Sequence, residues 1–503
     1  MKVSDHQPVQ DGSENLLNYL VISDLHVQEA DRSPTGRLFY FDDELADFLR
    51  YYVEEGRWRL ILNGDFIEFF HIPVRPDPAD PLLQGVTLYP TDFKFFPGTE
   101  WQKSVWKLQV ALQGHPKVLE ELARFIAAGN EIYLIRGNHD LEFCWPQVQE
   151  HFRLLVAQHH PPDLTLEAMQ AIARERIRFL PWFYYVPGLL YVEHGHQYDA
   201  YCANAYNLHP VLPGNERRIE LSISALSMRY FGSRMEVVDP IAMENVNSIP
   251  TYIWRLMTTN PGQVIKMPAY WAEMAWRILW KITIPSPQTD AAVRTVHEER
   301  RREVARAASL PLETVDQIGA LAHPPMIRRW TECVKTTLAD LVVGAALGIV
   351  GVIFLTLLFH PGWRWWGAGS YLLLVVFLAL VGKNRLGKIN DHRNLRDIAQ
   401  RIHDILGVRY VLFGHSHNPD LAFLSPTGDH AYFNVGTWMP RSGGSQMIYF
   451  QLDWDEGGPA GRLMRWDRQE RHPLEVDTTL AGKGPFAEWR WKRRLARSGA
   501  PPA

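Results

Sequence analysis

The segment Tyr19-Leu-Val-Ile-Ser-Asp24-Leu-His26 joins a short apolar run to two side chains that can bind metal ions. The apolar residues, bounded on both sides by polar ones, predict a buried β-strand. Asp24 and His26 are two positions apart, so both side chains can lean toward the same side of the chain. The segment therefore predicts a strand that carries a pair of metal ligands at its carboxyl end.

Four later segments repeat this arrangement, in which an apolar strand is followed by polar ligands. Helical patterns at 42–55 and 116–128 alternate with the first three strands, which predicts a layered α/β fold with the ligands at the carboxyl ends of strands. We call these segments, together with the first, the five blocks. The four later blocks are Gly64-Asp65, Gly137-Asn138-His139-Asp140, His194-Gly195-His196 and Gly414-His415-Ser416-His417.

Together the five blocks offer seven side chains of the kind that hold two adjacent divalent metals. Asp65, alone at its strand end, is the expected bridge between the two ions. Imidazole and carboxylate donors together favour Mn, Fe, Zn or Co over calcium. We expect two divalent ions. Mn²⁺ is the leading choice, and Fe, Zn, Co or Mg are the alternatives. The expected ligands are Asp24, His26, Asp65, Asn138, His194, His415 and His417.

Two histidines of the fourth block need separate roles. His194 directly follows the apolar run 189–193 and is assigned as the ligand, while His196 is expected to line the substrate site. The reverse assignment, with one of the two simply hydrogen-bonded in the core, stays open.

The order DxH, GD, GNH(D/E), His and GHxH resembles the calcineurin-like metallophosphoesterase superfamily over roughly residues 18–200 and 405–450. This resemblance implies a four-layer αββα sandwich and a metal-bridging hydroxide as the nucleophile. It implies that His139 assists the leaving group or steadies the phosphoryl group, and that Asp140 orients His139. It also implies a first metal site of Asp24, His26, Asp65 and His417 and a second of Asp65, Asn138, His194 and His415.

The chain departs from the family pattern in two respects. Glu68 stands near the position where many relatives have a second Asp after the GD block, so it has either that role or none. The chain also has a partial resemblance to the bacterial UDP-diacylglucosamine pyrophosphatases, through the position of its large insertion and through His194-Gly195. Those enzymes carry Arg where this chain has His139, so the resemblance transfers little about the substrate.

The insertion separates the fourth and fifth blocks, which must meet in space. Two apolar runs within it, 338–359 and 366–382, are joined by a tryptophan-rich loop and predict a two-helix transmembrane hairpin; a buried helical hairpin is the alternative. Basic residues flank both outer ends. The positive-inside rule then predicts an integral inner-membrane protein with the catalytic domain and both termini in the cytoplasm.

These features predict five parts in the chain. They are a flexible N-terminus (1–17), the first part of the metallophosphoesterase core (18–204), a helical insertion with the transmembrane hairpin (205–399), the second part of the core (400–470) and a basic, aromatic C-terminal tail (471–503).

The composition of the chain reduces the number of function classes to consider. The formal net charge of -4 argues against a general nucleic-acid binder, and the three scattered cysteines predict no disulfide framework. We predict a dinuclear phosphoesterase that cleaves a phosphoester or pyrophosphate bond of a lipid-linked or amphiphilic substrate at the bilayer surface. The alternatives are a membrane-tethered phosphodiesterase or protein phosphatase acting on soluble substrates, and a non-catalytic membrane receptor or scaffold. The sequence does not predict the oligomeric state.

Overall fold

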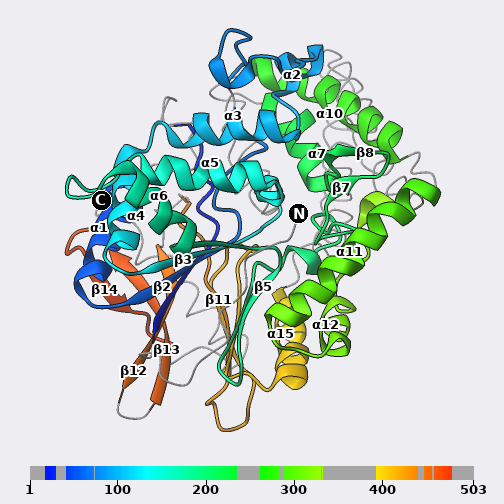
Figure 1. Ribbon diagram of the computed structural model, residues 1–503. Helices are drawn as coiled ribbons and strands as arrows, with labels where there is room; N and C mark the ends of the chain where they lie inside the picture. The colour runs from blue at the N-terminus through cyan, green and yellow to red at the C-terminus, as the bar shows by residue number, and fades with distance from the viewer. Residues whose placement is uncertain are drawn as a thin grey trace, which may run out of the picture.

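Two β-sheets stacked face to face form the centre of the protein, and helices cover their outer faces (Figure 1). In this computed structural model the described residues are 17–29, 41–72, 74–234, 261–282, 287–329, 331, 392–439, 447–455 and 458–478 of the 503-residue chain.

The first sheet has the strand order β14-β13-β12-β1-β2-β3-β4. The strands β1 to β4 are parallel, and β12 to β14 extend the sheet beyond β1 in antiparallel fashion. Its strands are β1 (Asn18–Ile22), β2 (Trp58–Asn63), β3 (Glu131–Ile135), β4 (Ile177–Leu180), β12 (Ile448–Asp455), β13 (Gly458–Asp467) and β14 (His472–Glu475).

The second sheet has the order β10-β11-β9-β6-β5. Its central pair, β6 and β9, is parallel, with Tyr191 opposite Val411, although more than two hundred residues separate the two strands in sequence. This pairing brings the fourth and fifth blocks together at one sheet edge. The strands are β5 (Phe183–Val186), β6 (Leu190–Glu193), β9 (Tyr410–Phe413), β10 (Asp420–Phe423) and β11 (Ala431–Asn434).

Alternation along the strands divides the core into layers. In β1, Leu20 packs with the helices, whereas Val21 packs between the sheets against residues such as Val192. Each central strand is therefore apolar on both faces, as parallel sheets covered on both sides require. The helices on the outer face of the first sheet are α1 (Asp42–Glu54), α3 (Trp101–Leu112), α4 (Pro116–Ala127), α5 (Pro146–Ala157) and α6 (Leu166–Arg176).

The fourth layer comes from the insertion and from the helix that follows it. Tyr191 and Val411 on the outer face of the second sheet pack with α11 (Pro287–Ala307), α12 (Leu312–Gly319) and α15 (His392–Leu406). The described chain thus forms a mixed α/β sandwich with a helical insertion. The smaller elements are α2 (Pro90–Phe95), α7 (Ile223–Tyr230), α10 (Pro261–Ile282), β7 (Val211–Leu212), β8 (Asn215–Ile219) and the 3-10 turns η1 (Pro81–Leu83), η2 (Leu141–Cys144), η3 (His196–Tyr198), η4 (Gly232–Arg234) and η6 (Met326–Arg328).

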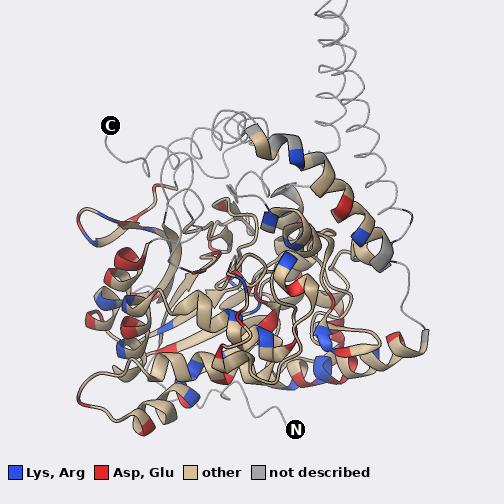
Figure 2. Ribbon diagram, turned by 90° about the horizontal axis from the view of Figure 1, so that it is seen from above, with Lys and Arg blue, Asp and Glu red and all other residues tan. Residues whose placement is uncertain are grey.

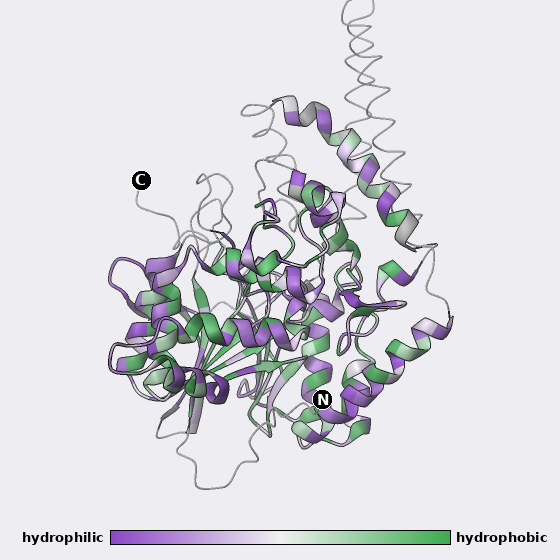
Figure 3. Cartoon of the chain, turned by 45° about the horizontal axis from the view of Figure 1, so that its top comes forward, coloured by the Kyte–Doolittle hydropathy of each residue, from purple (hydrophilic) through white to green (hydrophobic). Residues whose placement is uncertain are grey.

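The predicted transmembrane hairpin needs correction. Within the ranges given above, no helix combines the length and the apolar character that a membrane crossing requires. The long helix α10 carries Lys266, Glu273 and Arg277 along its length, and charged residues recur along the insertion helices (Figures 2 and 3). This finding overturns the transmembrane part of the predicted fold class. The inner-membrane location and its cytoplasmic orientation are withdrawn with it.

Some predicted segments fall outside the described residues. These are the two runs of the predicted hairpin, 338–359 and 366–382, together with 1–16 and 479–503 of the predicted terminal parts. The start of the predicted C-terminal tail lies within the fold, because β14 pairs with β13 at the edge of the first sheet.

A buried ion pair fastens the helical layer to the loops that follow the strands. Lys107 Nζ of α3 donates to Glu142 Oε1 of η2 at 2.6 Å and to Phe69 O at 3.2 Å. Both charged side chains are fully buried. Since Phe69 follows the second block and Glu142 follows the third, this pair holds the two loops against the same helix.

We predict that Lys107→Met lowers the free energy of unfolding by about 3–5 kcal/mol, because it leaves the Glu142 carboxylate buried without its partner. Urea denaturation measures the change. The matched control is Lys117→Met, which removes an exposed pair with Asp43 and should change stability little. Equal effects of the two substitutions would contradict the structural role of the buried pair.

Candidate metal centre

Unusual backbone conformations mark the ends of the strands. The positive φ angle of Asp65, 51°, lies in the left-handed region, which costs a non-glycine residue on the order of 1 kcal/mol. Such conformations persist where the surrounding structure holds them, and they are concentrated at functional sites. The other residues of the five blocks in this region, glycines aside, are Asp24, His26, His415 and His417, with φ angles of 55°, 49°, 63° and 54°.

Two glycines let the blocks approach one another closely. Gly64 has a φ of 78°, and a Cβ added to it would collide with the imidazole ring of His194. A Cβ on Gly137 would collide with the carboxylate and the backbone nitrogen of Asp65. The second, third and fourth blocks therefore touch only because glycine occupies these positions.

The first cluster of candidate ligands consists of Asp24, His26, Asp65 and His417, all buried, with one ligand atom of each lying within 4.8 Å of the others. His417 Nε2 lies 3.0 Å from Asp24 Oδ1 and 3.3 Å from His26 Nε2. His26 Nε2 lies 3.8 Å from Asp65 Oδ2. This is the set that the resemblance implied for the first metal.

The second cluster consists of Asp65, His194 and His415, again with ligand atoms within 4.8 Å of one another. His194 Nε2 lies 3.2 Å from Asp65 Oδ2 and 3.2 Å from Asn138 Oδ1. All four residues implied for the second metal therefore lie together. Asp65 belongs to both clusters and occupies the position that a bridging ligand requires.

Hydrogen bonds outside the clusters fix which ring nitrogen faces inward. His194 Nδ1 donates to the carbonyl oxygen of Asn63 at 2.9 Å, and His26 Nδ1 donates to Glu68 Oε2 at 2.9 Å. Each bond holds the proton on Nδ1 and leaves the lone pair of Nε2 available to bind a metal ion. Metal-binding histidines in proteins are oriented in this way.

The inward oxygens of the two clusters fit a cation. Asp24 Oδ1 and Asp65 Oδ2 are buried, and the nearest side chains are histidines that are themselves candidate ligands: His417 Nε2 lies 3.0 Å from Asp24 Oδ1, and His194 Nε2 lies 3.2 Å from Asp65 Oδ2. Burying a carboxylate oxygen without a partner is costly unless a cation neutralises it. The mixed oxygen and nitrogen donors suit borderline divalent metals. The buried His/Asp clusters therefore form a metal site typical of dinuclear metallophosphoesterases.

The ionisation of these groups reflects the same concentration of negative charge. Burial raises the pKa of Asp65, but the neighbouring His194 and His139 outweigh it and hold the pKa well below its usual range. Burial lowers the pKa of His194, but Asp65 and Asp24 outweigh it and raise the pKa to about 9. The carboxylates thus draw a proton onto His194, and a divalent cation would satisfy the same potential in its place.

His139 lies beside the clusters and is held by Glu68. Its Nδ1 lies 2.7 Å from Glu68 Oε2, and its backbone N–H donates to Asp65 Oδ1 at 2.8 Å. Asp140 instead accepts hydrogen bonds from the backbone N–H groups of Gly137, at 2.6 Å, and Phe66, at 2.9 Å. Glu68 therefore contacts the His139 ring directly, and Asp140 fastens two blocks to each other; the orienting role that the resemblance implies for Asp140 stays a prediction.

The charges of the two carboxylates differ accordingly. Burial raises the pKa of Glu68, but His139 and His26 outweigh it, so the pKa is lowered and the group is anionic. Burial, together with Asp65, raises the pKa of Asp140 to about 7. Glu68 can thus support a positive charge on His139.

The structure also places His196 and Asp199 at the second cluster. The His196 ring centroid lies 5.4 Å from that of His194, and within the described chain neither of its ring nitrogens has a hydrogen-bond partner. Burial, with His194 and His415, holds the pKa of His196 well below its usual range. Asp199 Oδ2 lies 3.3 Å from His415 Nε2.

Sequence reasoning gave Asp199 no role and left that of Glu68 undecided. For Glu68 a signal of function existed, since it lies three residues after Asp65, near the position where many relatives carry a second acidic residue. For Asp199 no such signal existed, because a single Asp after a short turn is usually a surface or capping residue.

Residues 17–221 match the family model described as Calcineurin-like phosphoesterase, a match that includes four of the five blocks and covers less than half of the chain. No curated protein matches the chain significantly. The match confirms the predicted superfamily but not the more specific branch. Combined with the buried His/Asp clusters, it identifies residues 17–221 as a calcineurin-like phosphoesterase domain with the metal site of a metallophosphoesterase, an enzyme of the hydrolase class.

Proposed function

We propose that the protein hydrolyses a phosphoester or pyrophosphate bond at a dinuclear centre bridged by Asp65. The observation that carries this proposal is the position of the Asp65 carboxylate, which belongs to both ligand clusters. Two divalent cations bound there would supply Lewis-acid polarisation of the phosphoryl oxygens and a hydroxide at neutral pH. We propose Mn²⁺ as the metal, because the donors are a mixture of imidazole, carboxylate and amide groups.

The role proposed for the chain's own residues begins with His139. Glu68 accepts a hydrogen bond from Nδ1 and stabilises the protonated ring, which leaves Nε2–H to donate to an oxygen of the phosphoryl or leaving group. The same carboxylate accepts from His26 Nδ1, so one buried side chain orients both a metal ligand and the proposed proton donor. His196, neutral and close to His194, is proposed to line the substrate position.

The proposal names the type of bond that is cleaved, a phosphoester or phosphoanhydride, and does not name the rest of the substrate. The expectation of a lipid-linked substrate at a bilayer depended on the transmembrane hairpin, and with that hairpin corrected it has no support. The absence of general nucleic-acid binding, inferred from the net charge, stays a prediction.

We predict that Asp65→Asn removes metal from both sites. Even changes outside the ligand shell cost about 10–100-fold in metal affinity or activity, so loss of the shared ligand should lower the hydrolysis of para-nitrophenyl phosphate by about 100-fold or more. Metal analysis of the purified protein accompanies the assay. Asp163→Asn, an exposed aspartate outside the site, is the matched control. Full activity with full metal content in the Asp65→Asn variant would sink the assignment.

His139→Ala should separate catalysis from metal binding. We expect turnover to fall by about 100-fold to 10,000-fold, the usual contribution of a general acid, while metal content stays near that of the wild type. Glu68→Gln should also lower turnover, since it removes the charge that supports the imidazolium. His160→Ala, which replaces a histidine that belongs to neither ligand cluster and hydrogen-bonds the carbonyl oxygen of Pro161, serves as the control. Loss of metal from the His139→Ala variant would show that His139 is a ligand instead.

A further inference from the structure

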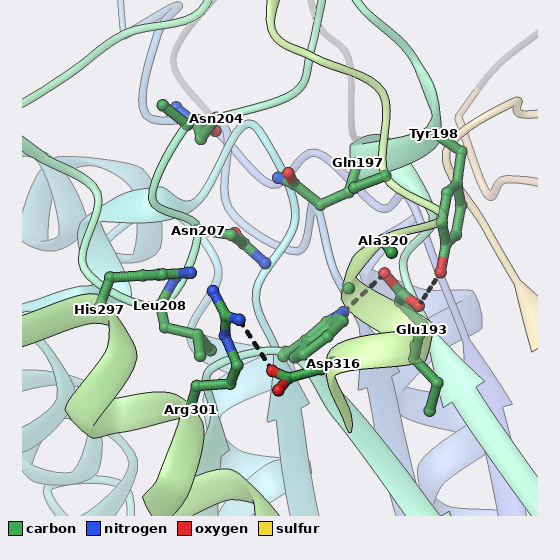
Figure 4. A pocket seen from close by; sticks show the side chains of 15 residues that line it. Glu193, Gln197, Tyr198, Asn204, Asn207, Leu208, His297, Arg301, Asp316 and Ala320 are labelled. Atoms are coloured by element: carbon green, nitrogen blue, oxygen red, sulfur yellow. Dashed lines mark hydrogen bonds and ion pairs between the residues drawn. The ribbon is translucent and has the colours of Figure 1, made fainter. Parts of the chain in front are cut away.

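A cavity of about 340 Å³ lies between the end of the second sheet and the insertion helices α11 and α12 (Figure 4). Its size falls within the range of small-molecule pockets. Glu193 and Gln197 line it, whereas His194, the residue after Glu193, belongs to the second metal cluster. The cavity therefore adjoins the segment that carries the metal ligand but is lined by different side chains.

Three buried amide side chains line this cavity with polar atoms that lack partners. Gln197, Asn204 and Asn207 are 5%, 6% and 8% exposed. In the part of the chain that the structure describes, no hydrogen bond reaches Gln197 Nε2, Asn204 Oδ1 or Asn207 Oδ1. A buried polar atom without a partner costs about 1–3 kcal/mol, so three around one cavity call for partners from outside the chain, either water or a ligand that displaces it.

The orientation of Asn204 is fixed by its other amide atom. Asn204 Nδ2 donates to the carbonyl oxygen of Glu220 at 2.9 Å, which leaves Oδ1 as an acceptor. Figure 4 shows Gln197, Asn207 and His297 around the same space as Asn204. The lining thus offers two acceptors and one donor that have no partner in the protein.

The charged groups of the lining are already paired. Glu193 accepts hydrogen bonds from Trp182 Nε1 at 2.9 Å, Tyr191 OH at 2.6 Å and Tyr198 OH at 2.7 Å. Arg301 Nη1 lies 2.8 Å from Asp316 Oδ1. These contacts leave the cavity without a charge that calls for an ionic ligand.

His297 adds a neutral group. Its Nδ1 accepts a hydrogen bond from the Leu208 N–H at 3.3 Å. Burial, with Arg301 close by, lowers its pKa to about 4, so the ring is uncharged near pH 7. A phosphate or carboxylate would find no free cation among the described lining residues.

We propose that this cavity is a binding site for an uncharged, hydrogen-bonding small molecule, which donates to the side-chain oxygens of Asn204 and Asn207 and accepts from Gln197. A nucleoside base and the hydroxyl groups of a sugar share this chemistry. The site is separate from the proposed hydrolysis, since binding requires neither the metals nor a phosphoryl group.

Isothermal titration calorimetry on the full, metal-loaded chain tests the proposal with uridine, adenosine, glucose and inorganic phosphate as separate probes, each up to about 10 mM, the range of weak binding. We expect saturable binding of a nucleoside or of glucose, and which of them binds distinguishes the two sources. Asn207→Leu should weaken that binding at least about tenfold, because it removes an acceptor without changing the size of the side chain much. Asn215→Leu, at an exposed asparagine outside the cavity, should leave binding unchanged.

Thermal unfolding and metal analysis exclude a folding defect. Since Asn207 Oδ1 is unsatisfied within the described chain, the Asn207→Leu variant should keep its metals and a Tm at or above that of the wild type. The proposal is overturned if neither the nucleosides nor glucose bind, or if they bind the Asn207→Leu variant as well as the wild type. It is also overturned if inorganic phosphate binds and the Asn207→Leu substitution weakens the binding of phosphate. A variant with lowered Tm would show that Asn207 is structural, and Gln197→Met then tests the donor side of the same cavity by the same measurements.

Discussion

The Asp65 carboxylate is the point at which the two ligand clusters meet. Its Oδ2 lies 3.2 Å from His194 Nε2 and 3.8 Å from His26 Nε2, while its Oδ1 accepts the backbone N–H of His139. One oxygen is thereby fixed by the neighbouring loop, and the other remains buried and directed at the clusters. The geometry of the centre depends on this side chain, because Asp65 is the anionic ligand that the two clusters share.

The fold serves this constraint through strand pairing. The parallel pairs β1–β2 and β2–β3 bring the first three blocks to one edge of the first sheet, and the pair β6–β9 brings the last two to the matching edge of the second. The insertion leaves after the fourth block, and its helices α11 and α12 pack on the outer face of the second sheet. Backbone strain at Asp24, Asp65 and His417 is offset by the packing of these layers.

Much of the fold and the site was predictable because it is encoded locally. Short apolar runs ending in Asp24, Asp65 and His415 predict strands that carry ligands, and the family match confirms the superfamily that their order suggested. The position of Glu68 three residues after Asp65 signalled a role, but its partner His139 lies 71 positions away in the chain, and sequence spacing cannot identify that contact. The cavity could not be predicted for the same reason, since α11 and β6, which both line it, are far apart in the sequence. The membrane prediction extended two apolar runs to a transmembrane architecture, and among the described residues no helix is long and apolar enough to support it.

Anomalous X-ray diffraction from crystals of the manganese-loaded protein tests the central claim most directly. The account predicts two manganese peaks about 3.5–4 Å apart, as in other two-metal sites, with the carboxylate of Asp65 between them. One peak alone, or two peaks that share no contact with Asp65, would contradict it.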